Sequence, residues 1–148
     1  PKETGGWFGV IELARTFEES AGWEYSTDRE DELLGDESRK VRQGNTTEYL
    51  VWETPLLGEF ALTLYAKENA IGDIVELAVS SDGRDWQSVT YTVTEAGPSA
   101  QGWYQLVLAG HAADYDDVDF FRLTLHASDA PVEVQIGEAR FSGMRRPD

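Results

Sequence analysis

Residues able to do nucleophilic or acid–base chemistry are few in this chain, apart from the carboxylates. It has two histidines, His111 and His126, and no cysteine. A Ser-His-Asp site needs one of these histidines, and no G-x-S-x-G segment supplies the serine. Neither histidine has a partner at the short spacing of a zinc motif. The sequence therefore contains no recognisable nucleophile–base pair or zinc site.

Carboxylates are abundant, but their spacing does not define a catalytic pair. Two adjacent pairs stand out, Glu18-Glu19 and Asp116-Asp117. Glycoside hydrolysis needs two carboxylates at a set separation across a cleft, whereas neighbours along a strand point to opposite faces. We therefore expect both pairs to be solvated surface groups and the domain to be non-catalytic.

Composition limits the partners. The 148 residues fit one domain, 1–148, which we expect to be excised from a longer multidomain chain. The formal net charge is −16, from 28 acidic and 12 basic residues. This charge argues against nucleic acid and anionic membranes as partners, since both attract clustered Lys and Arg. No apolar run approaches the ~18 residues of a membrane span. Neutral glycans remain compatible with the charge.

Alternation of apolar and polar residues predicts strands. The clearest runs are 60–67, 74–80, 88–94, 103–108, 120–126 and 132–136, with a further strand at 46–53. The segment 28–40 could pass for a helix, but it lacks a 3.6-residue period, so we expect an acidic loop. Turn residues, such as Gly83 in the hairpin 81–84, separate the runs. The pattern predicts an all-β fold, an antiparallel two-sheet β-sandwich of jelly-roll type.

One phase of these runs is apolar and should form the core between the two sheets. The predicted core residues are Phe60, Leu62, Leu64, Val75, Leu77, Val79, Leu106, Leu123, Leu125, Val134 and Ile136.

The opposite phase matters for function, because sugar recognition needs aromatic rings and polar side chains on an outward face. Tyr65, Arg122 and His126 lie in that phase, and Trp103 is out of phase with its apolar neighbours. Exposed aromatic residues tend to mark partner sites. We therefore predict Trp103, Tyr65, Arg122 and His126 as ligand contacts, although a plain solvated face would show the same pattern.

Three further tryptophans are assigned differently. Trp52 is in phase with Leu50, which leaves its face ambiguous, so it is a reserve ligand contact. Trp23 follows a glycine and Trp86 ends a hairpin, and we expect both to pack inward.

Four segments carry a resemblance to a known group: 16–23, 45–51, 80–86 and 135–142. The first contains an acidic strand and a Gly-Trp pair, and the third is an S-x-D-G-x-x-W hairpin. Together they resemble bacterial carbohydrate-binding modules of the galactose-binding-like β-sandwich group. The resemblance implies a secreted, non-catalytic domain. Such a domain binds a polysaccharide or oligosaccharide and shares its parent chain with a catalytic domain, a glycoside hydrolase or lyase.

The same resemblance implies one structural calcium ion between the first and last strands. Glu18 and Glu138 match the ligand positions, and Glu12 is a spare candidate. The last strand usually carries Asp where this chain has Glu138. Calcium is held by six to eight oxygen ligands, and pairing of the terminal strands is expected to bring these acids together.

Two functions therefore remain open. One is a sugar-binding module, and the other is a structural or interaction domain that spaces or docks its neighbours without binding a ligand. An exposed aromatic platform or groove would favour the first.

Overall fold

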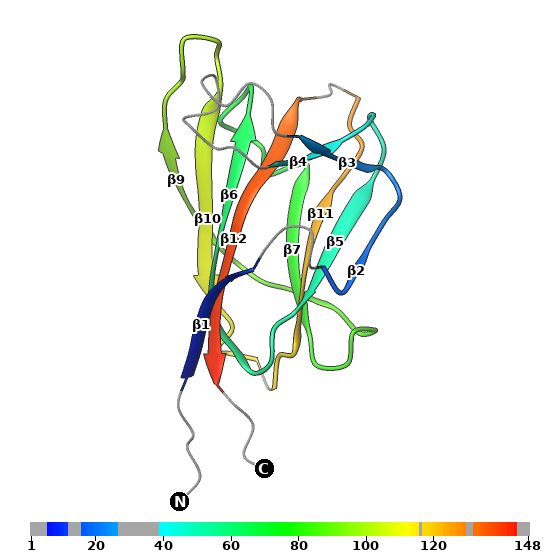
Figure 1. Ribbon diagram of the computed structural model, residues 1–148, viewed down its shortest axis with the longest axis vertical. Coiled ribbons are helices and arrows are strands. Elements are labelled where there is room, and N and C mark those ends of the chain that lie inside the picture. The colour runs from blue at the N-terminus through cyan, green and yellow to red at the C-terminus, as the bar shows by residue number, and fades with distance from the viewer. Residues whose placement is uncertain (1–5, 12–15, 27–38, 116, 130–131, 145–148) are drawn as a thin grey trace, which may run out of the picture.

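The computed structural model describes residues 6–11, 16–26, 39–115, 117–129 and 132–144. These residues form two antiparallel sheets packed face to face, and none of them forms a helix (Figure 1). No helix that could cross a membrane is present in these ranges. Most of the expected acidic loop 28–40 lies outside them.

Sheet A has seven strands in the described part of the chain, and sheet B has five. The path of sheet A is β3 (Trp23–Ser26), β4 (Arg39–Arg42), β12 (Val134–Met144), β6 (Leu57–Ala66), β10 (Tyr104–His111) and β9 (Thr92–Ala96), with β1 (Gly6–Ile11) also on β12. The path of sheet B is β2 (Glu18–Glu19), β5 (Glu48–Glu53), β11 (Phe120–Leu125), β7 (Val75–Ser80) and β8 (Gln87–Ser88).

The strand order is that of a jelly roll. Sheet A contains β4-β12-β6-β10, and sheet B contains β5-β11-β7-β8. Along the chain, β4, β5, β6 and β7 alternate between the sheets, β8 stays with β7, and β10, β11 and β12 alternate again. These four-stranded parts of the two sheets, joined by connections that cross between the sheets, have the jelly-roll arrangement. The predicted fold class is confirmed.

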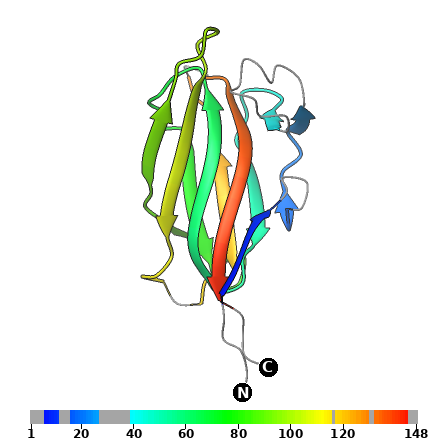
Figure 2. The same ribbon diagram turned by 60° about the vertical axis from the view of Figure 1, so that its left-hand side comes forward.

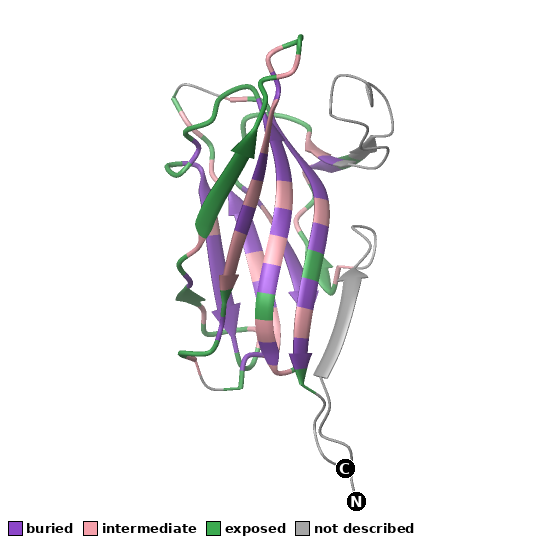
Figure 3. Ribbon diagram, turned by 90° about the vertical axis from the view of Figure 1, so that its left-hand side faces the viewer, coloured by how far each residue is buried: buried purple, intermediate pink, exposed green. Residues whose placement is uncertain are grey.

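The core lies between the sheets, and all eleven predicted core residues are buried. Alternation is clear along β6, where Phe60, Leu62 and Leu64 point inward and are at most 3% exposed. Figure 3 shows the same alternation of buried and less buried residues along the central strands of sheet A. Each such side chain stabilises the fold by about 1.5–3 kcal/mol relative to exposure.

Aromatic residues fill the centre of this core. The ring of Phe121 lies 4.7 Å from that of Phe60, 5.2 Å from Phe141 and 6.3 Å from Trp52, measured between centroids. The tilted and edge-on arrangements are those that aromatic pairs prefer.

The run 88–94, predicted as one strand, is divided. β8 ends at Ser88 in sheet B, and β9 begins at Thr92 in sheet A. Between them Val89 is buried and its N–H donates to the carbonyl of Leu77 at 3.0 Å. Apolar and polar residues alternate in sequence through this segment. The chain crosses from sheet B to sheet A within it, so its residues cannot all pair with one neighbouring strand.

Candidate functional site

The residues predicted as ligand contacts fall in three separate places. Trp52 is in the core between the sheets, where it is fully buried against Phe121 and Phe141. Tyr65 and Trp103 point away from the core on the outer face of sheet A and form a cluster of their own. Arg122 lies on the outer face of sheet B, and His126 lies farther along the same face.

The expectation that Trp103 and Tyr65 are exposed is wrong: they are 0% and 2% exposed. Their outward phase was predicted correctly, but other groups cover them. Lys67 lies with Nζ 4.7 Å from the Trp103 ring centre and donates to the carbonyl of Gln101 at 2.6 Å. The Gln105 amide donates to the Tyr65 hydroxyl at 3.2 Å. Lysine stems often cover apolar surface in this way, and neither ring offers an open stacking face.

The acids predicted to share a calcium ion lie on different sheets. Glu18 belongs to β2 at the edge of sheet B, and its Oε2 accepts the Tyr49 hydroxyl proton at 2.7 Å. Glu138 points away from the core of sheet A and forms an ion pair with Arg140. The terminal strands β1 and β12 do pair, but β2 joins the other sheet. Glu18 and Glu138 thus belong to different sheets and have different partners among the described residues. The shared calcium site stays a prediction, and Glu12 lies outside the described residues.

The adjacent acids Glu18 and Glu19 diverge, as neighbours on a strand should. Glu19 Oε1 accepts from the buried Lys40 Nζ at 2.5 Å, whereas Glu18 bonds to Tyr49. Of the other pair, Asp116 lies outside the described residues and Asp117 is exposed. Neither adjacent pair, as far as the structure describes it, provides two carboxylates that face each other across a cleft.

A hollow of about 240 Å³ opens on the outer face of sheet B, and we call it the Arg122 hollow. Neighbouring strands build it, because Glu18 of β2 is in register with Val51 of β5, which is in register with Arg122 of β11. Its lining is completed by aromatic residues and the tip of a hairpin: Phe17, Tyr49, Gly83 and Trp86.

Side chains in this hollow are held by specific contacts. Arg122 lies half-buried beneath Trp86, with Cζ 4.5 Å from the ring centre, a cation–π geometry. The hydrogen bond to the Glu18 carboxylate, aided by burial, raises the pKa of the Tyr49 hydroxyl above its usual value. Phe17 is 58% exposed, and its ring lies 5.0 Å from that of Phe120. The hollow thus combines rings, a guanidinium group and a carboxylate.

The hairpin between β7 and β8 presents Trp86, and Asp82 fixes its shape. Asp82 Oδ1 accepts the backbone N–H groups of Arg84 and Asp85 at 2.8 and 3.0 Å, and the Ser80 hydroxyl at 3.0 Å. These donors, first Asp85 and then Arg84, lower the pKa of Asp82 to about 2. Gly83 takes a φ of 81°, which only glycine adopts without strain. The predicted turn therefore holds Trp86 in place over Arg122.

His126 lies farther along the same face. Its Nε2 is 2.8 Å from Glu76 Oε1, and both side chains are partly exposed. This pair is a polar surface contact beyond the lining of the Arg122 hollow.

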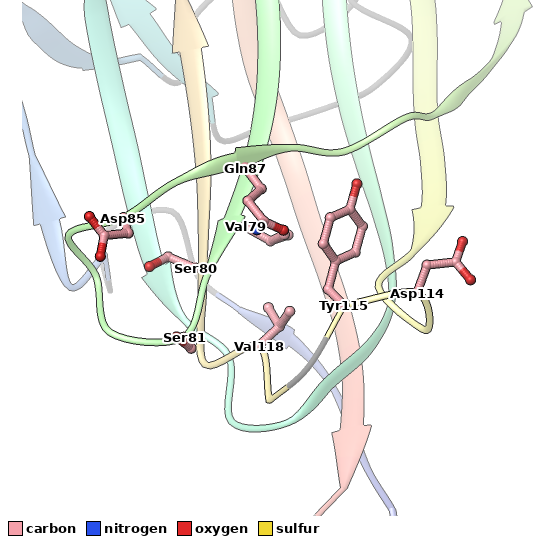
Figure 4. A pocket seen from close by; sticks show the side chains of 8 residues that line it. All are labelled: Val79, Ser80, Ser81, Asp85, Gln87, Asp114, Tyr115 and Val118. Atoms are coloured by element: carbon pink, nitrogen blue, oxygen red, sulfur yellow. The ribbon is translucent and has the colours of Figure 1, made fainter.

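A second hollow, of about 380 Å³, lies on the other side of the same hairpin (Figure 4). Val79 and Val118 belong to its apolar part, and Asp85 and Asp114 stand at opposite sides of it. Tyr115 donates its hydroxyl proton to the carbonyl of Ser88 at 2.8 Å. In the described part of the chain no three His, Asp or Glu side chains are grouped to hold a metal ion.

Sequence reasoning missed the most informative residues of the Arg122 hollow. Trp86 was expected to pack inward, yet it is only half-buried and covers a charged group. Tyr49 alternates with the buried Leu50, so its outward position was available from the same period-two rule. No protein-family model matches the chain, and no curated protein is detectably similar to it. Function must therefore be argued from the geometry of these residues.

Proposed function

We propose that this domain binds a neutral glycan in the Arg122 hollow and does not cleave it. The supporting observation is the arrangement of Trp86 over Arg122 beside Tyr49 and Glu18. Aromatic rings suit the C–H faces of sugars, while a few convergent polar groups orient the hydroxyls. The hollow is smaller than the roughly 300–1,000 Å³ of drug-sized pockets, so it suits one sugar ring of a longer chain.

Charge supports a neutral ligand. The chain carries a net charge of −16, which repels polyanions at long range. Inside the hollow Arg122 and Glu18 have opposite charges, so their fields partly cancel. An uncharged sugar is neither repelled by the net charge of the domain nor opposed by one of the two charges in the hollow. Its binding should therefore depend only weakly on salt.

The wider role follows as part of the same proposal. A non-catalytic domain of this kind would be secreted and would hold an attached polysaccharide-degrading enzyme against its substrate. Among the described residues, the hydrogen-bond partners of the two histidine rings are not serines. His126 pairs with Glu76, and His111 Nδ1 accepts from the backbone N–H of Ala113 at 3.4 Å.

Native gel electrophoresis through a panel of soluble polysaccharides tests the proposal. We expect at least one neutral glycan to retard the domain, and Trp86→Ala to weaken the retardation by removing a ring of the hollow. Arg140→Ala, a change on the outer face of sheet A, is the control and should migrate as the wild type. If no neutral glycan retards the wild-type domain, the spacer function is favoured instead. New reducing ends after incubation would refute the non-catalytic part.

A further inference from the structure

We propose that the Arg122 hollow selects sugars with two adjacent free hydroxyl groups, and so prefers 1,4-linked to 1,3-linked neutral polysaccharides. The inference rests on the proposed function and assigns its ligand class. It follows from the hydrogen-bonding capacity of Arg122 and Glu18.

Arg122 supplies only donors. A guanidinium group has five N–H donors and no acceptor. Its Nε is buried and has no hydrogen-bond partner among the described residues, while the ring of Trp86 covers the group. A desolvated donor without a partner is costly to the fold. Arg122 also lines the hollow, so we infer that the donors of its guanidinium group are those that a ligand oxygen meets there.

Glu18 supplies only acceptors. An ionised carboxylate accepts hydrogen bonds and donates none. Its Oε2 already accepts the proton of Tyr49 at 2.7 Å, which leaves Oε1 for a ligand donor. Because the Tyr49 hydroxyl has used its proton on Glu18, it can only accept further bonds. The hollow thus has donors on the side of Arg122 and acceptors on the side of Glu18.

The two groups face the same space from strands that are not neighbours. Glu18 and Arg122 are both in register with Val51, which lies between them. Strands are about 4.8 Å apart, so the two backbones are separated by roughly 10 Å. Figure 1 shows β2, β5 and β11 side by side in this order. Although both side chains line the hollow, no ion pair joins them within the described residues. The space between them can therefore receive ligand groups.

Hydroxyl groups match this arrangement because each can both donate and accept. Two hydroxyls on adjacent carbons can meet both sides at once: one accepts from Arg122 and the other donates to Glu18. A ligand carboxylate could accept from Arg122 but would face Glu18 as a like charge. Internal residues of 1,4-linked hexose chains carry free hydroxyls at C2 and C3, which are adjacent. A 1,3-linkage uses O3 and leaves hydroxyls at C2 and C4, which are not.

Titration calorimetry with defined polysaccharides tests this selectivity. The probes are a soluble 1,4-linked glucan, a 1,4-linked mannan, a 1,3-linked glucan, and the 1,4-linked chains after periodate oxidation and borohydride reduction. Periodate cleaves the C2–C3 bond between adjacent hydroxyls, and reduction leaves an uncharged chain without that pair. We expect at least one 1,4-linked chain to bind about tenfold or more tightly than the 1,3-linked chain, and the treated chains to lose this advantage.

Two substitutions attribute the selectivity to the named residues. Arg122→Lys keeps the charge but loses the fixed fork of donors, and we expect about a tenfold weaker affinity. Glu18→Gln keeps the size but replaces acceptor capacity with donors, and we expect it to reduce the preference for 1,4-linked chains. Arg140→Lys, on the outer face of sheet A, is the matched control and should bind as the wild type. Circular dichroism checks each fold, and the periodate comparison needs only the wild-type protein.

The possible failures are distinguishable. Equal affinity for 1,3- and 1,4-linked chains, or binding that survives periodate treatment, would overturn the selectivity while leaving glycan binding intact. Binding to none of the neutral chains would overturn both proposals.

Discussion

Phe121 is the sharpest test of the core, because its ring contacts three other aromatic rings. The side chain is fully buried and lies against Trp52, Phe60 and Phe141. Replacing a buried Phe by Ala costs about 3–5 kcal/mol through lost transfer free energy and the cavity left behind. Aromatic pairs add about 0.5–1.5 kcal/mol each beyond burial. Loss of three pairs therefore places Phe121→Ala at the upper end of the range, near 5 kcal/mol.

A loss of that size is a large part of the ~5–15 kcal/mol that stabilises a typical domain. Urea denaturation, followed by far-ultraviolet circular dichroism, measures this loss of unfolding free energy. The dependence of the unfolding free energy on urea concentration should have the same slope as in the wild type. The matched control is Phe17→Ala, because that ring is 58% exposed and should cost less than about 1 kcal/mol. If Phe121→Ala costs less than about 1 kcal/mol, or no more than Phe17→Ala, the assignment of Phe121 to the centre of the core is refuted.

Other predictions concern the hairpin, the covered ring and calcium. The pKa of Asp82 is lowered from 3.8 to about 2, so its carboxylate stabilises the fold above about pH 4, and this contribution is lost as the pH falls towards 2. The melting temperature of Asp82→Asn should therefore fall less between pH 4 and 2; a fall equal to that of the wild type would contradict this. Trp103→Ala should cost about 3–5 kcal/mol of stability in urea denaturation, and an unchanged midpoint would contradict its burial. Any rise in melting temperature with millimolar calcium should persist in Glu138→Gln, since Glu138 is already paired with Arg140 and belongs to a different sheet from Glu18; loss of the rise in this variant would contradict this.

Local alternation was enough to predict the eleven core residues, all of which are buried. Leu123 and Leu125 point inward and Arg122 points outward, because a strand has a side-chain period of two. The same rule placed Trp103 and Tyr65 outward, which is correct, yet both are buried. Exposure depends on groups that pack from elsewhere in the chain, such as Lys67, and period-two reasoning contains no information about them.

The sequence pattern also could not predict which of the two sheets each strand joins. Strands β6 and β11 have equally clear alternation, but one belongs to sheet A and the other to sheet B. The predicted contacts Tyr65 and Arg122 therefore lie on opposite sides of the sandwich. Glu18 and Glu138 were separated for the same reason. A strand's own residues define its two faces, whereas its sheet is decided by pairing between distant segments.

The pairing of β1 with β12 has a mechanical consequence. The strands are antiparallel, with Gly6 opposite Met144, so the outer ends of both strands leave the sandwich at the same end (Figure 2). Tension applied at these two points loads the hydrogen bonds between β1 and β12 one pair at a time, starting at Gly6. Such a ladder peels open at lower force than one that is sheared along its length. β12 stays paired with β6 on its other side, so the C-terminal strand remains in the sheet. Phe17 and Glu18, which line the Arg122 hollow, follow β1 along the chain. Once β1 has separated, the same tension therefore reaches the β2 edge of sheet B, where this hollow lies.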